Sequence, residues 1–102
     1  MININSSKIN KTKAILRRYN LSYLAIISKH RKIIEGGDPS TTKIAYKLHD
    51  YFKKVKASKI ILETKEGKAI VMYRRGDNEI FIIADRDIAY LVLEIIKKEL
   101  NL

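Results

Sequence analysis

The residues best suited to chemistry in this sequence are two histidines and two neighbouring carboxylates. His30 and His49 are the only histidines, and neither has a second ligand at the close spacing that zinc sites use. Asp85 and Asp87 could in principle share a metal ion or a proton, but they stand where a helix is expected to begin, and carboxylates are favoured there as caps. We therefore expect structural roles for all four residues.

Three further motifs resemble functional signatures without completing them. The segment 36–40 (Gly-Gly-Asp-Pro-Ser) precedes a helix as phosphate-binding loops do, yet it lacks the Lys-Ser/Thr pair that holds phosphate and Mg²⁺. The Arg75-Gly76-Asp77 tripeptide matches an adhesion motif, but its residues are those expected in a turn, and we interpret it as one. The serines at positions 6, 7 and 58 have no partner base in view. The sequence thus predicts no catalytic residue, no metal site and no cofactor.

Length and composition bound the class of protein. The chain has 102 residues, no Cys, 46% hydrophobic residues and 31% charged residues, which is typical of one folded domain without disulfides or thiolate chemistry. We expect that domain to span residues 1–102, with residues 1–7 as a loose tail. Unbroken apolar runs such as Ile80 to Ala84 are far too short to cross a bilayer, and the first residues lack a signal-peptide pattern. These features predict a cytoplasmic protein.

The positive charge is concentrated in the first part of the chain. The net charge is +10, with +11 in residues 1–59 and −1 in residues 60–102. Such asymmetry is typical of a basic face for nucleic acid, acidic lipid or an acidic protein. It also fits a lysine-rich composition that merely places solvated lysines on helices.

The C-terminal half predicts three strands and a helix. Apolar runs at Ile60–Leu62, Ala69–Tyr73 and Ile80–Ala84 are separated by turns at Gly67 and Gly76, and because they are continuous we expect helices over both faces of their sheet. From Asp85 onward the apolar residues follow helical spacing.

An earlier helix is predicted from Thr41 to Lys56, with Ser40 or Thr41 as N-cap. Its apolar stripe comprises Ile44, Leu48, Tyr51, Phe52 and Val55.

Residues 8–36 allow two interpretations. Apolar residues at spacings of three and four permit one long helix. The alternative is a helix over 8–19 followed by strands over 21–28 and 32–36, joined by a tight turn at residues 29–31. We favour the hairpin, because two more strands make an adequate sheet.

The resulting order, α-β-β-α-β-β-β-α, predicts a three-layer α/β sandwich with a five-stranded, mainly antiparallel sheet covered by helices on both faces. With that order, the sequence resembles the roadblock family of small dimeric proteins, which is related to longin and profilin-like folds. The resemblance is most specific in residues 75–87, a Gly-Asp turn, an apolar strand and an Ala-Asp-x-Asp entry to the last helix. The sequence departs from the family pattern at Ala89 and Leu91, where Asn and Gly are common.

The resemblance implies a non-enzymatic homodimeric scaffold or regulator that binds a Ras-like small GTPase. In that family the central helix and the strand after it pair across the dimer, and an apolar edge strand gives an independent reason for such pairing. The interface residues expected here are Lys47, Tyr51, Val55, Ile60, Ile61 and Leu62. The basic residues expected to face an acidic partner are Arg17, Arg18, Lys43, Lys47 and Lys54.

The alternative function is nucleic-acid binding by the basic N-terminal half. Lysines and arginines there are interleaved with Tyr19 and Tyr23, and clustering of this kind suffices to neutralise phosphates. However, no RNA-binding signature and no arginine pair for base edges is present. A membrane-surface role is less favoured, since the lysine-rich helices have few large apolar anchors.

Overall fold

The computed structural model describes residues 5–102 and contains three helices and five strands in the predicted order. Their bounds are α1 Ser6–Arg18, β1 Tyr23–Ser28, β2 Arg31–Gly37, α2 Pro39–Lys54, β3 Lys59–Glu63, β4 Lys68–Arg75, β5 Asn78–Asp85 and α3 Arg86–Leu100. The hairpin interpretation of residues 20–36 is confirmed. Ser6 and Ser7 are helical, and residues 1–4 of the expected N-terminal tail lie outside the described residues.

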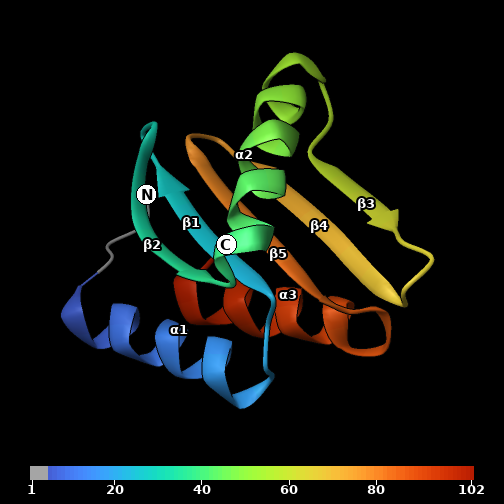
Figure 1. Ribbon diagram of the computed structural model, residues 1–102. Helices are drawn as coiled ribbons and strands as arrows, with labels where there is room; N and C mark the ends of the chain where they lie inside the picture. The colour runs from blue at the N-terminus through green and yellow to red at the C-terminus, as the bar shows by residue number, and fades with distance from the viewer. Residues whose placement is uncertain (1–4) are drawn as a thin grey trace.

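The five strands form one antiparallel sheet in the order β2-β1-β5-β4-β3. Helices α1 and α3 pack side by side over one face, and α2 lies alone over the other (Figure 1). The predicted three-layer α/β sandwich is therefore confirmed. The edge strands are β2 and β3.

Two apolar cores lie on opposite faces of the sheet. The larger, beneath α1 and α3, includes Leu24, Ile82 and Val92, all fully buried. The smaller, beneath α2, is built around Phe52, Met72 and Phe81. Because strand side chains alternate between faces, β1, β4 and β5 supply both cores, which explains their continuous apolar sequences.

The helix starts differ from those predicted. Helix α2 begins at Pro39, with Asp38 rather than Ser40 or Thr41 at the N-cap, and the Asp38 side chain makes no capping hydrogen bond. Proline suits the first helical position, because it has no N–H to leave unpaired and its φ is already helical. Asp85 precedes α3 without capping it through its side chain, and instead accepts a 2.7 Å hydrogen bond from Lys68.

The segment 36–40 is explained by backbone packing. Gly37 has a φ of 141°, and a Cβ added there would collide with the carbonyl oxygen of Ser22. The Asp38 N–H donates to that same oxygen at 3.0 Å. This glycine therefore permits a close approach between the end of β2 and the residues leading into β1.

Candidate protein interaction surface

Helix α2 presents four distinct sides, which follow from its 100° rotation per residue. Ala45 and Phe52 face the sheet and are buried. One flank, directed toward β3 and β4, includes Ile44, Leu48, Tyr51 and Val55. The other flank is directed toward β1 and β2, and a ridge of lysines points away from the sheet.

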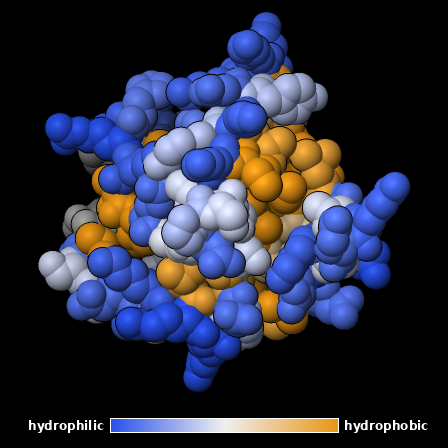
Figure 2. All heavy atoms as spheres, viewed as in Figure 1, coloured by the Kyte–Doolittle hydropathy of each residue, from blue (hydrophilic) through white to orange (hydrophobic). Residues whose placement is uncertain are grey.

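The flank directed toward β3 is apolar and exposed. Ile44 and Tyr51 are 54% and 56% exposed, although the sequence placed them on one apolar stripe with buried Phe52. Leu48 and Ile60 border the core beneath α2 and remain half-buried. In Figure 2, hydrophobic atoms gather beside α2, on the side where Figure 1 places β3 and β4.

Strand β3 continues this apolar surface to the edge of the sheet. Within residues 5–102, it pairs only with β4, so one row of its backbone groups has no strand beside it. Ile60 and Leu62 alternate with Ile61, which packs against the core of the opposite face. Leu62 is 38% exposed. We call this combined area, Ile44, Leu48, Tyr51, Val55, Ile60 and Leu62, the α2–β3 surface.

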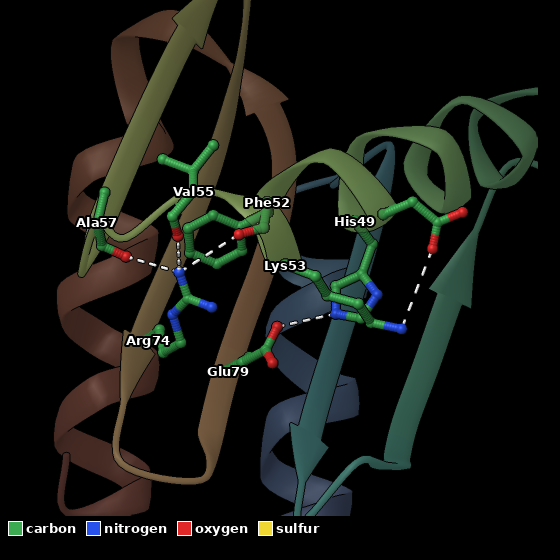
Figure 3. Close-up of polar contacts among 8 residues, drawn as sticks. His49, Phe52, Lys53, Val55, Ala57, Arg74 and Glu79 are labelled. Carbon is green, nitrogen blue, oxygen red and sulfur yellow. Dashed lines mark hydrogen bonds and ion pairs between the residues drawn. The ribbon is translucent and has the colours of Figure 1, made fainter.

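Arg74 of β4 fixes the end of α2 relative to β3. One of its terminal guanidinium nitrogens donates to the carbonyl oxygens of Val55, Ala57 and Phe52, at 2.6, 2.9 and 3.3 Å (Figure 3). Its guanidinium carbon also lies 4.3 Å from the centre of the Phe52 ring. A cation at a helix C-terminus satisfies carbonyls that have no partner in the helix. Arg74 thus holds together the two elements that form the α2–β3 surface.

Glu35 fixes the other half of α2 to β1 and β2. Its carboxylate accepts hydrogen bonds from Tyr23 at 2.6 Å and Tyr46 at 3.3 Å, and pairs with Lys32 at 3.2 Å. Desolvation raises the pKa of Glu35, but the hydrogen bonds from Tyr23 and Lys32 and the charge of Lys32 outweigh it, so the net pKa is lowered. Burial, followed by the hydrogen bond to Glu35, raises the pKa of Tyr23.

The expected basic residues do not lie together. Lys43, Lys47 and Lys54 are exposed on the outward ridge of α2. Arg17 and Arg18 are exposed on the last turn of α1, which packs on the opposite face of the sheet. The basic N-terminal half is therefore divided between two layers, and the lysine ridge of α2 is one part of it.

The anchoring residues Arg74 and Glu35 were not singled out from the sequence. Both act through contacts with residues 11 to 22 positions away, which no local spacing reveals. His49 contacts Glu79, 30 positions away, at 2.8 Å. The only available signal was a glutamate inside the predicted strand 32–36, where charged residues are uncommon, and an arginine directly after the predicted run Ala69–Tyr73.

The chemistry-bearing residues form no metal centre in the described part of the chain. No group of three or more His, Asp or Glu side chains in residues 5–102 could hold a metal ion. Among these residues, no helix is both long and apolar enough to span a membrane.

The comparisons with known proteins concern the fold. No protein-family model matches this sequence, and no curated protein matches it. Among solved structures, the chain is similar to MglB of Myxococcus xanthus, at 11% sequence identity and a TM-score of 0.61, over 96% of this chain and 94% of that chain. It is also similar to an MglB with a tetrameric arrangement, at 8% identity and a TM-score of 0.49, over 95% and 87% of the two chains. The first similarity confirms a roadblock/longin-like fold for nearly the whole chain.

Proposed function

We propose that this protein is a non-enzymatic, cytoplasmic homodimer that acts as a scaffold or regulator for a Ras-like small GTPase. The observation that supports the proposal best is the α2–β3 surface, in which an exposed apolar helix flank adjoins an apolar edge strand. The roadblock/longin-like fold adds support, because the roadblock resemblance implies pairing through these same two elements.

In the proposed dimer, β3 pairs with the β3 of a second copy across a twofold axis, and the two sheets join into one of ten strands. Pairing satisfies the free backbone groups of β3, which otherwise invite uncontrolled association. Ile60 and Leu62 then lie beneath the two α2 helices, while Ile61 contributes on the opposite face. Tyr51, Val55 and the aliphatic part of Lys47 line the contact between helices.

The lysine ridge of α2 is the proposed contact for the GTPase. Lys43, Lys47 and Lys54 point away from the sheet and are exposed, and dimerisation would bring two such ridges close together. An acidic patch on the partner would be steered toward this concentration of positive charge.

The test is affinity capture with the tagged chain from an extract of its own organism, after nuclease treatment, with GDP or a non-hydrolysable GTP analogue added. We expect a Ras-like GTPase to be retained in a nucleotide-dependent manner. The double variant Lys43→Glu/Lys54→Glu should lower its recovery about tenfold, since each reversal replaces attraction by repulsion and neither residue lies in the proposed dimer contact. The matched control is Arg17→Glu/Arg18→Glu, which makes the same change of charge on the opposite layer.

Two results would contradict the proposal. Nuclease-sensitive recovery of nucleic acid, with no GTPase, would assign the positive charge to nucleic-acid binding. Equal losses in the two double variants would show that overall charge, and not the α2 ridge, governs capture.

A further inference from the structure

His30 and His49, which lie far apart in the sequence, line the same pocket. It has a volume of about 340 Å³ and lies between the β1–β2 hairpin and the flank of α2 that faces away from the α2–β3 surface. The lining residues are Ile27, His30, Lys32, Tyr46, His49, Asp50, Lys53 and Glu79. Figure 3 shows His49 and Lys53 extending from α2, with Glu79 opposite His49.

Hydrogen-bond donors predominate in this pocket. Two imidazoles, two ammonium groups and one phenol line it, against only the carboxylates of Asp50 and Glu79. Glu79 is already paired with His49 at 2.8 Å, and Asp50 lies 4.0 Å from Lys53 with a side chain that is 77% exposed. Behind the pocket, Glu35 pairs with Lys32 at 3.2 Å and accepts from the Tyr46 hydroxyl at 3.3 Å. The ammonium groups of Lys32 and Lys53 have further N–H groups beyond these pairs, and together with His30 they suit a ligand that is rich in acceptors.

The turn that brings His30 to the pocket has an unfavourable backbone. Ser28 pairs with Arg31, so the loop contains only Lys29 and His30, with φ of 52° and 65°. Asn-Gly is the preferred pair for such a turn, and each other residue costs roughly 1–2 kcal/mol in this conformation. The Lys29 N–H donates to the Asp77 carbonyl at 3.0 Å, which holds the turn against the β4–β5 turn. Residues retained in costly conformations concentrate at functional sites.

The electrostatic setting of α2 also tolerates an anion here. His49 and Lys53 lie near the C-terminal end of the helix, where unpaired carbonyls carry partial negative charge. Arg74 donates to the carbonyls of Phe52 and Val55 at this end, and so places a positive charge against them.

From these observations we propose that the pocket binds a small phosphorylated molecule, whose phosphate dianion is held by His30, Lys32, His49 and Lys53. These donors come from a turn, a strand and a helix, so they approach from several directions, as a tetrahedral oxyanion requires. The volume suits a small ligand and not a folded partner. The pocket occupies the flank of α2 opposite the proposed dimer contact, so this inference does not depend on the proposed function.

The experiment is a titration of the full chain with inorganic phosphate at constant ionic strength, followed by NMR of the two histidine rings. Sulfate serves as a second tetrahedral dianion, and acetate serves as a planar anion. We expect saturable shifts of both rings with phosphate and sulfate, and weaker effects with acetate.

The variant Lys53→Gln should weaken phosphate binding about tenfold, while Lys54→Gln, with the same loss of charge on the outward ridge, should leave it unchanged. Both side chains are exposed, and thermal melting will verify that each variant folds. Shifts that do not saturate, or equal weakening in the two variants, would overturn the proposal and leave only non-specific ion association. A variant that cannot dimerise should still bind phosphate, which separates failure of this inference from failure of the dimer.

Discussion

At the scale of single residues, the two anchors of α2 differ in their chemistry. Arg74 holds one end of the helix through neutral carbonyl acceptors, so its contribution should change little with pH. Glu35 holds the other half as a charged acceptor for two tyrosine hydroxyls and Lys32. Its contribution must therefore depend on ionisation.

Replacing Glu35 by glutamine should destabilise the protein at neutral pH and not in acid. Because the pKa of Glu35 is lowered from its ordinary value of 4.5, folding is favoured by its ionisation above that pH, and the benefit disappears as the pH falls through the lowered value. Chemical denaturation should give a loss of about 1 kcal/mol at pH 7, since the carboxylate is partly exposed, and the gap should close on acidification. Glu66→Gln is the control, because Glu66 makes no side-chain hydrogen bond or ion pair within residues 5–102. A pH-independent gap would mean that Glu35 acts through packing alone.

At the scale of elements, the turn between β1 and β2 is the place where the backbone conformation departs most clearly from what its residues prefer. The sequence predicted a tight turn over residues 29–31, and the structure places it at Lys29 and His30 alone. Neither residue favours positive φ, so the sequence held no turn signal, and helical spacing competed with the hairpin interpretation. The hairpin was favoured because a three-stranded sheet needed additional strands, and that requirement concerns the whole sheet and not the turn.

The double variant Lys29→Asn/His30→Gly should stabilise the fold. It supplies the residues that this two-residue turn prefers, and relief of backbone strain should outweigh the greater entropy of glycine in the unfolded chain. We expect the free energy of unfolding to rise by about 1 kcal/mol in urea denaturation, with an unchanged slope. Arg31→Asn, one residue beyond the turn, should change it by less than about 0.5 kcal/mol. A less stable double variant would show that contacts of the Lys29 and His30 side chains stabilise the fold by more than their positive φ destabilises it.

Features that depend on residues close together in the sequence could be predicted from it, whereas features assembled from distant residues could not. Three continuous apolar runs correctly indicated strands, and β4 and β5 are covered on both faces as expected. Strand β3 has the same kind of sequence but is half-exposed, because a run of apolar residues does not reveal whether a helix or a second chain covers it. The α2–β3 residues were therefore identifiable, whereas the pocket, assembled from residues 27 to 79, was not.

At the scale of the whole molecule, the α2–β3 surface should determine the oligomeric state. Tyr51→Glu places a charge within the proposed contact, and we expect the dimer to dissociate at least tenfold more readily in sedimentation equilibrium, because a buried unpaired charge is costly. Tyr90→Glu is a closely matched control, since Tyr90 is 55% exposed and Tyr51 is 56% exposed, but it lies on α3 across the sheet. A wild-type chain that remains monomeric at high concentration, or equal effects of the two variants, would contradict the pairing.

The central position of β1 and β5 also constrains how the chain reaches this structure. Residues 23–28 pair with residues 78–83, so the middle of the sheet joins segments made early and late in synthesis. The β1–β2 hairpin, α1 and α2 emerge from the ribosome before the strand that completes their sheet, and their apolar faces remain uncovered until then. Closure of such distant segments slows folding, and incomplete sheets are prone to aggregate. Chains truncated before β5 should therefore be sensitive to proteases and dependent on chaperones, with protection acquired when the last strand becomes available.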